Sequence, residues 1–223
     1  MISLYDILEA GNGQPFGEPG AEIFTDFSFD SRTATESSLY VALKTDAGDG
    51  HQYIAEAVKN GATGVLCTRP PDIDTNGLSV ILVKDTYAAL MMWSSYILRK
   101  FAPQVIAVTG SSGKSVTVAA ISHVLQTRHS VLSSVDVVGG RLSLPMTLAK
   151  LNGEHRIVVL ELAASQPGEL AAMVRSVKPQ VGVITRIGTE HRSEMAHLLA
   201  DEDVVLIESL PNDGLAVLNY DDD

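Results

Sequence analysis

A glycine-rich loop between an apolar run and a helical run is the feature of this sequence that most restricts its fold. The loop, called the phosphate loop below, consists of Gly110, Ser111, Ser112, Gly113, Lys114 and Ser115. Residues 104–109 (QVIAVT) before it predict a strand, and residues 114–127 predict a helix. A tight turn from a strand into a helix directs backbone N–H groups and the positive end of the helix dipole at one point. Such a turn predicts an α/β fold with a mononucleotide site at the end of a strand.

Two side chains of the phosphate loop carry the expected chemistry. Lys114 can reach the β- and γ-phosphate oxygens of a nucleotide, and the Ser115 hydroxyl stands where a Mg²⁺ ligand is needed. Val108 occupies the position of the first glycine in the common P-loop spacing, so the loop is a shortened variant. The competing interpretation is a plain Gly/Ser turn with a solvated Lys114. The flanking strand and helix favour the nucleotide site.

The second half of the chain alternates strands with helices. Further strands are predicted at 156–162, 181–185 and 215–219, and further helices at 168–177 and 202–210. This alternation is typical of a parallel, doubly wound sheet, in which ligands bind at the carboxyl ends of the strands.

The first half predicts a smaller unit with both kinds of element. Its predicted helices lie at 2–10, 54–60 and 86–100, and its strands at 23–29, 39–43, 64–68 and 79–83. We therefore expect an α/β chain with two domains. A small N-terminal α/β substrate domain (1–100) is followed by a doubly wound parallel-sheet P-loop domain (101–223) that is incomplete at its C-terminus.

The composition excludes some classes of protein. The chain has 16 Lys and Arg against 27 Asp and Glu, a net charge of −11, whereas a nucleic-acid binder normally displays a basic face. The single Cys67 excludes an intramolecular disulfide and reads as a buried structural thiol in a reducing compartment. No leader opens the chain and no apolar stretch approaches ~18 residues. We expect a cytoplasmic protein without membrane insertion.

Two residues at predicted strand ends extend the nucleotide site. Glu161 ends the second strand of the later half, and His191 lies in the loop after the third. Carboxylate oxygen is a natural ligand of Mg²⁺. Each residue by itself is more often an ordinary surface residue, but both fall at the edge where the phosphate loop is expected. We therefore predict Ser115, Glu161 and His191 as metal ligands, and Lys114 and His191 as catalytic residues.

Seven segments, in matching order over nearly the whole chain, resemble the Mur ligases. These ATP-dependent enzymes build the peptide stem of bacterial peptidoglycan, a cell-wall polymer. The segments are 29–43 (FDSRTATESSLYVAL), 49–66 (DGHQYIAEAVKNGATGVL), 105–117 (VIAVTGSSGKSVT), 144–151 (LPMTLAKL), 159–170 (VLELAASQPGEL), 181–191 (VGVITRIGTEH) and 210–222 (LPNDGLAVLNYDD). Those in the second half look most like the branch that adds the D-alanyl-D-alanine dipeptide.

The resemblance implies a two-step reaction with ATP and Mg²⁺ as cofactors. ATP phosphorylates a substrate carboxylate, and an amino acid or dipeptide amine then displaces phosphate from the acyl phosphate to form an amide. Lys114 would neutralise charge on the transferred group, beside the metal ligands named above. The first domain would hold the UDP end of a UDP-muramoyl peptide through Ser28, Asp30, Ser31 and Arg32. Ordinary turn chemistry is the alternative for these four residues.

The sequence departs from the family pattern at three places. The family's carbamoylated lysine, which helps to bridge Mg²⁺, falls by register on Asp203. Asp203 or its neighbours Asp201 and Glu202 could supply a carboxylate instead, although the residues themselves favour solvated acids on a helix surface. The family's Asn-Asn-Glu falls on Gly139-Gly140-Arg141, and its TNIG asparagine on Arg186.

Three functions therefore stay open. The first is an ATP-dependent carboxylate–amine ligase that is inactive as this chain alone, because the family's amine-binding third domain lies outside these residues. The second is a non-catalytic Mur-ligase-like module that binds a nucleotide or a UDP-sugar. An unrelated P-loop kinase fits the phosphate loop but leaves the first half of the chain unexplained.

Overall fold

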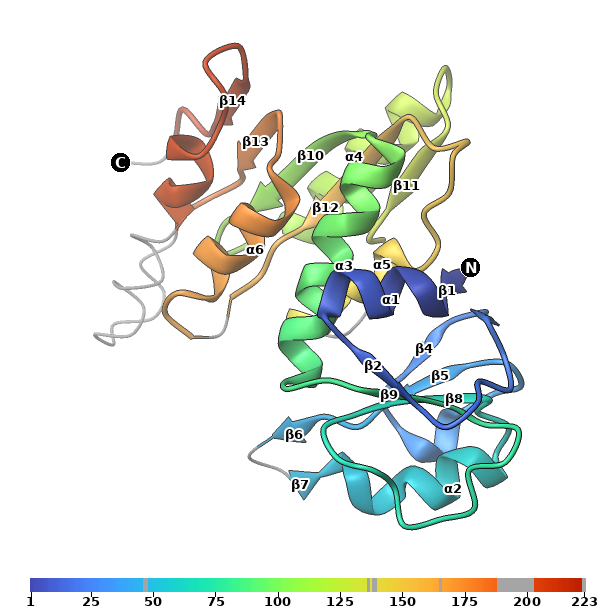
Figure 1. Ribbon diagram of the computed structural model, residues 1–223. Helices are drawn as coiled ribbons and strands as arrows, with labels where there is room; N and C mark the ends of the chain where they lie inside the picture. Colours follow the sequence, from blue (N-terminus) through green and yellow to red (C-terminus); the bar gives the residue numbers. More distant parts are fainter. Residues whose placement is uncertain (46–47, 136, 138–139, 165, 188–202, 222–223) are drawn as a thin grey trace. The chain divides into compact units, whose positions relative to one another are not determined.

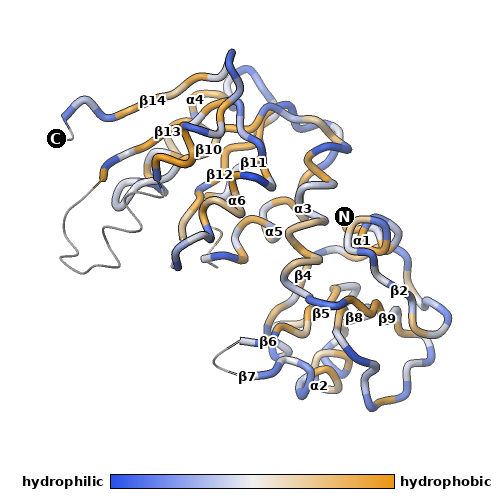
Figure 2. Tube along the Cα trace, turned by 60° about the vertical axis from the view of Figure 1, so that its left-hand side comes forward, coloured by the Kyte–Doolittle hydropathy of each residue, from blue (hydrophilic) through white to orange (hydrophobic). Residues whose placement is uncertain are grey.

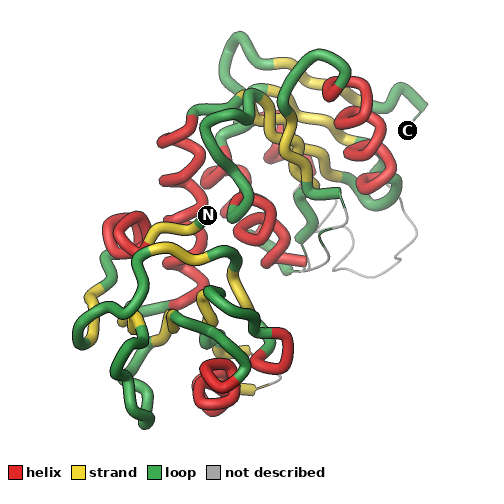
Figure 3. Tube along the Cα trace, turned by 90° about the vertical axis from the view of Figure 1, so that its right-hand side faces the viewer, coloured by secondary structure: helices red, strands yellow, loops and turns green. Residues whose placement is uncertain are grey.

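The computed structural model describes residues 1–45, 48–135, 137, 140–164, 166–187 and 203–221 (Figure 1). The chain forms two compact units, Met1–Ile97 (unit 1) and Leu98–Asp223 (unit 2). Helices flank the strands in each unit (Figure 3), and the central strands of each sheet are mostly hydrophobic (Figure 2). No helix among the described residues is long and apolar enough to cross a membrane.

Unit 1 contains a five-stranded sheet in the order β2-β9-β8-β5-β4. The strands are β2 (Gln14–Phe16), β9 (Ser79–Leu82), β8 (Gly64–Cys67), β5 (Leu39–Val41) and β4 (Phe27–Ser28). They are parallel except for β2, which pairs antiparallel with β9. The helices are α1 (Leu4–Gly11), α2 (Ile54–Lys59) and α3 (Thr86–Phe101). The last of these continues into unit 2.

Both faces of the unit 1 sheet are covered. Val65 and Cys67 of β8 lie in one buried cluster with Ile54 and other residues around α2. Trp93 of α3 is buried away from this cluster, and Phe27 packs edge-on against its ring with the centroids 4.9 Å apart. Burial on both faces explains why these strands are almost continuously apolar instead of alternating.

Smaller elements complete unit 1. Two short antiparallel pairs form, β1 with β3 and β6 with β7. Their bounds, with those of two 3₁₀ helices, are β1 (Ile2–Ser3), β3 (Ile23–Phe24), β6 (Lys44–Thr45), β7 (Gly48–Asp49), η1 (Ser31–Thr33) and η2 (Gly50–Tyr53).

The single strand predicted at 23–29 is wrong, because it divides into β3 and β4, which belong to different sheets. The Asp26 carboxylate accepts a hydrogen bond from the Phe27 amide at 2.9 Å, which is turn chemistry between two strands. The helix predicted from Ile2 begins at Leu4, since Ile2 and Ser3 pair with β3. The segment between the predicted helix 2–10 and the predicted strand 23–29 contains the edge strand β2, where Pro15 is tolerated.

Unit 2 contains a wholly parallel five-stranded sheet in the order β11-β12-β10-β13-β14. The strands are β11 (Val131–Ser133), β12 (Ile157–Glu161), β10 (Gln104–Thr109), β13 (Val181–Ile184) and β14 (Leu215–Leu218). The helices are α4 (Lys114–Gln126), η3 (Gly140–Leu142), α5 (Ser143–Leu148) and α6 (Glu169–Val177), and residues 203–208 are also helical. The predicted α/β fold class is confirmed.

The two faces of the unit 2 sheet are covered by different helices. Ile106, Val108 and Val159 share a buried cluster with Val118 of α4. A Cβ added at Gly182 would point to the opposite face, where it would lie 3.2 Å from Leu206 and Ile207 of the helical residues 203–208. Right-handed crossovers also place α6 on that second face.

This winding positions a site. The chain leaves β10 toward the α4 face and leaves β12 toward the α6 face. In open parallel sheets, ligands bind in the crevice that such a reversal creates at the carboxyl ends of the strands. The ends of β10 and β12 are therefore the place to look for a ligand site in unit 2.

Candidate functional site

The phosphate loop follows β10 directly and ends in the first turn of α4. Gly110 and Gly113 have φ angles of 128° and 83°, which side chains strongly disfavour. Gly113 is the N-cap of α4 and no side chain caps this helix. An uncapped helix start leaves backbone N–H donors for an anion. Lys114 curls back over the loop, and its Nζ donates to the Gly110 carbonyl at 2.8 Å.

The segment after β13 braces the phosphate loop. The Arg186 carbonyl accepts from the Ser111 amide at 2.7 Å and from the Ser111 hydroxyl at 2.9 Å. The Thr185 hydroxyl donates to the Ser112 carbonyl at 2.7 Å. Sequence reasoning did not select Thr185, although its place at the end of a predicted strand, within the Mur-like segment 181–191, was a signal for it.

Ser115 and Glu161 meet, as the sequence predicts. The Ser115 hydroxyl donates to Glu161 Oε2 at 2.7 Å, and the Glu161 amide donates to Ser134 Oγ at 2.7 Å. A hydroxyl and a carboxylate side by side have the chemistry that suits Mg²⁺, which is usually held by one or two protein groups, with phosphates and water completing its shell. The described residues contain no group of three His, Cys, Asp or Glu side chains that could hold a metal by themselves. His191 lies outside the described residues.

A pocket of about 560 Å³ opens beside this pair. Its polar lining includes Ser115, Ser134, Ser143 and Glu161, and its apolar lining includes Val116 and Val135. A second pocket of about 620 Å³ is lined by Lys178, Pro179 and Gln180, before the start of β13. That pocket lies at the wrong end of the strands for the phosphate loop, so the pocket beside Ser115 and Glu161 belongs to the candidate site.

The expectation that Asp203 is a solvated acid is wrong. Asp203 is only 8% exposed, and its Oδ1 accepts a hydrogen bond of 2.6 Å from the Thr109 hydroxyl. The reason is the packing of the helical residues 203–208 on the sheet face to which Thr109 points. Asp201 and Glu202 lie outside the described residues, as does Gly139. Gly140 and Arg141 belong to η3.

The four predicted substrate residues of unit 1 lie in one turn. Asp30 caps η1 by accepting from the Arg32 amide, and its carboxylate also pairs with the Arg32 guanidinium at 2.6 Å. These Arg32 hydrogen bonds lower the pKa of Asp30 to about 2. The buried Ser28 and Ser31 donate to the Asp30 carbonyl and to Glu56, respectively. Contacts within the turn and with Glu56 of α2 engage all four residues, and the Arg32 side chain stays 78% exposed.

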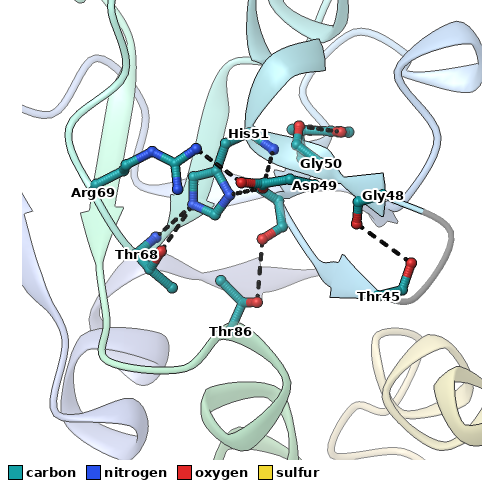
Figure 4. A network of polar contacts seen from close by, with 10 residues as sticks. Thr45, Gly48, Asp49, Gly50, His51, Thr68, Arg69 and Thr86 are labelled. Carbon is teal, nitrogen blue, oxygen red and sulfur yellow. Dashed lines mark hydrogen bonds and ion pairs between the residues drawn. The ribbon is translucent and has the colours of Figure 1, made fainter.

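The DGH segment forms a polar network at the end of β8 (Figure 4). His51 Nε2 accepts from the Thr68 amide at 2.9 Å, so the proton lies on Nδ1, which contacts Asp49 at 2.5 Å. Arg69 donates to the other Asp49 oxygen at 2.9 Å. Hydrogen bonds from Arg69 and His51 hold the pKa of Asp49 well below its usual range. The network ties η2 to β8.

Cys67 ends β8 and is fully buried, as predicted for a structural thiol. Burial raises the pKa of this thiol to about 11. A thiol that stays protonated near neutral pH is a poor nucleophile, and Cys67 therefore adds nothing to the candidate site.

Comparison with known proteins gives one consistent family. The Mur ligase middle domain matches residues 108–223. UDP-N-acetylmuramoyl-tripeptide–D-alanyl-D-alanine ligase of Escherichia coli (strain K12) is 30% identical over 223 residues, which are 99% of this chain and 48% of that enzyme. The chain thus spans about half the length of the curated relatives it matches.

Solved structures point to the same family. Crystal structure I of MurF from Acinetobacter baumannii matches this chain with a TM-score of 0.86 at 29% identity, and the match covers 99% of this chain and 49% of the MurF chain. MurF ligase from Thermotoga maritima in complex with ADP matches with a TM-score of 0.75 at 28% identity, and the match covers 88% of this chain and 46% of that ligase. The family match takes in the phosphate loop, Glu161 and Asp203, and the structural match takes in both units. This chain belongs to the Mur ligase family.

Proposed function

We propose that this chain provides the nucleotide and UDP-substrate sites of an ATP-dependent carboxylate–amine ligase. The observation that carries the proposal is the uncapped start of α4, with Lys114 folded over the phosphate loop beside the Ser115–Glu161 pair. Two relatives support it, an enzyme named for joining a UDP-N-acetylmuramoyl tripeptide to D-alanyl-D-alanine and a MurF ligase in complex with ADP. The proposal assigns residues 101–223 to ATP and residues 1–100 to the UDP end of the acid substrate.

The proposed chemistry has two balanced steps. A substrate carboxylate oxygen attacks the γ-phosphorus of ATP and releases ADP, and the amine then attacks the acyl carbon and releases phosphate. Backbone N–H groups of the phosphate loop and Lys114 hold the transferring group, and Ser115, Glu161 and His191 are the proposed Mg²⁺ ligands. Bound Mg²⁺ supplies electrostatic stabilisation of the transferring charge.

Amide formation needs more than phosphate binding. Holding two reactants in register is worth ~7–11 kcal/mol in well-oriented systems, so the amine must be held as well as the acyl phosphate. We propose that residues 1–223 by themselves bind nucleotide without completing the amide bond. A non-catalytic nucleotide-binding module is the second candidate, favoured by Asp203 at the position of the family's lysine.

Removing the Lys114 ammonium is expected to weaken ATP binding. Lys114→Ala removes one charge-assisted phosphate contact worth ~1.5–3 kcal/mol, which is about tenfold or more in affinity. Isothermal titration with Mg·ATP measures the change, and Lys150→Ala, which removes an exposed lysine of the same unit, should bind like the wild type. Equal affinities for both variants, or no binding by the wild type, would contradict the nucleotide site.

A UDP-sugar is expected to bind unit 1. Amide NMR signals of residues 28–32 should shift on titration, while those of the phosphate loop stay in place. Arg32→Ala should weaken binding roughly tenfold through loss of a charge-assisted contact, and Lys44→Ala, an exposed cation in β6, should not. Shifts confined to unit 2, or absent, would mean that the Asp30 turn is structural only.

A further inference from the structure

Two carboxylates flank the phosphate loop from opposite faces of the unit 2 sheet. Side chains alternate along a strand, so Glu161 lies on the same face as Val159, which is the α4 face. Thr109 lies on the other face, because Val108 points toward α4. Asp203 reaches Thr109 from that second face. The proposed chemistry uses Glu161 and leaves Asp203 without a role.

The contact between Thr109 and Asp203 is short and enclosed. Its oxygens are 2.6 Å apart, and the two residues are 3% and 8% exposed. A hydroxyl that donates to a carboxylate makes a charge-assisted hydrogen bond, roughly twice as strong as a neutral one. Burial strengthens it further, since water does not compete. The contact therefore fixes the Thr109 side chain and the backbone that carries it.

The backbone of Thr109 leads straight into the phosphate loop. The Thr109 carbonyl accepts a hydrogen bond from the Thr185 amide at 3.0 Å. The next residue, Gly110, accepts Lys114 Nζ on its own carbonyl. A displaced Thr109 would therefore move both the Thr185 brace and the Lys114 ammonium.

We propose that Asp203 is a positioning residue for nucleotide binding. Its carboxylate holds Thr109, and through Thr109 it holds the first peptide of the phosphate loop in the conformation that receives phosphates. The inference rests on the proposed nucleotide site and adds to it a residue that touches no substrate. It also gives Asp203 a role that differs from that of a lysine at the same position.

Two pairs of variants test the contact. Thr109→Val removes the donating hydroxyl at nearly constant shape, whereas Thr109→Ser keeps a hydroxyl. Asp203→Ala removes the accepting carboxylate, whereas Asp203→Asn keeps an uncharged acceptor. In titrations with Mg·ATP, Thr109→Val and Asp203→Ala should each bind about tenfold more weakly, and the conservative variants within about threefold of wild type. The Thr109→Val/Asp203→Ala double variant should bind no more weakly than the weaker single one.

A matched control separates positioning from general destabilisation. Thr86→Val in unit 1 removes a buried hydroxyl that donates to the Ala42 carbonyl at 3.2 Å, and it should lower the thermal midpoint without weakening ATP binding. Asp203 makes a further interaction, so the variants Thr109→Val and Thr109→Ser test the Thr109–Asp203 contact more specifically than the Asp203 variants do. They also test it if Asp203→Ala does not fold.

Three results would overturn the positioning role: unchanged ATP affinity in Thr109→Val, additive losses of affinity in the double variant, or an equal loss of affinity in Thr86→Val. In each case ATP binding by the wild type would still support the proposed function. Absence of ATP binding by the wild type would overturn both.

Discussion

Replacing Gly110 with alanine is expected to abolish ATP binding and to destabilise unit 2 by about 2–6 kcal/mol, the sum of backbone strain and overpacking. Gly110 has a φ of 128°, where an L side chain is strained. An added Cβ would lie 2.4 Å from the Thr185 hydroxyl and 2.9 Å from the Arg186 carbonyl. Both oxygens already brace the phosphate loop, so neither can move away without releasing it.

Gly168 provides the control for backbone strain alone. It has a φ of 85°, and an added Cβ would have no neighbour within 4 Å. Gly168→Ala should therefore cost only ~1–3 kcal/mol and should leave the affinity for ATP unchanged. Denaturant unfolding gives the two stabilities, and titration gives the two affinities. If Gly110→Ala matched Gly168→Ala in both measurements, the close approach of residues 185–186 to the loop would be refuted.

Replacing Trp93 with alanine is expected to destabilise unit 1 by about 3–5 kcal/mol, the usual cost of truncating a buried aromatic side chain. Trp93 is 1% exposed, and its ring packs edge-on against Phe27. Trp93→Phe should lose much less stability, because an aromatic ring still fills most of the space. Met92→Ala, on the same helix and 41% exposed, should be nearly neutral.

The same experiment tests whether the two units act separately. Because Trp93 is the only tryptophan, unfolding of these variants is followed by circular dichroism and amide NMR. ATP affinity, which we assign to unit 2, should be unchanged in Trp93→Ala under conditions where unit 2 stays folded. A loss of stability below about 1 kcal/mol in Trp93→Ala would show that the surrounding side chains relax and close the cavity. A parallel loss of ATP binding would show that the units do not act independently.

The sequence alone determined much of unit 2. The predicted strand 104–109 has the same bounds as β10, because a continuous apolar run ends at a glycine-rich turn. The meeting of Ser115 with Glu161 was also predictable, since parallel strands bring their carboxyl ends to one edge of the sheet. The family was also evident from the sequence, because segments in both halves of the chain resemble the Mur ligases in matching order.

Only the tertiary structure decided what braces the phosphate loop. Thr185 follows β13 like many strand-end residues, and its contact with the loop depends on β13 lying beside β10, which local sequence does not encode. The break between β3 and β4 depends likewise on which sheet each segment joins. The position of Asp203 is the clearest case. Helical periodicity leaves it an ordinary polar residue, and packing of residues 203–208 against the Thr109 face buries its carboxylate beside the phosphate loop.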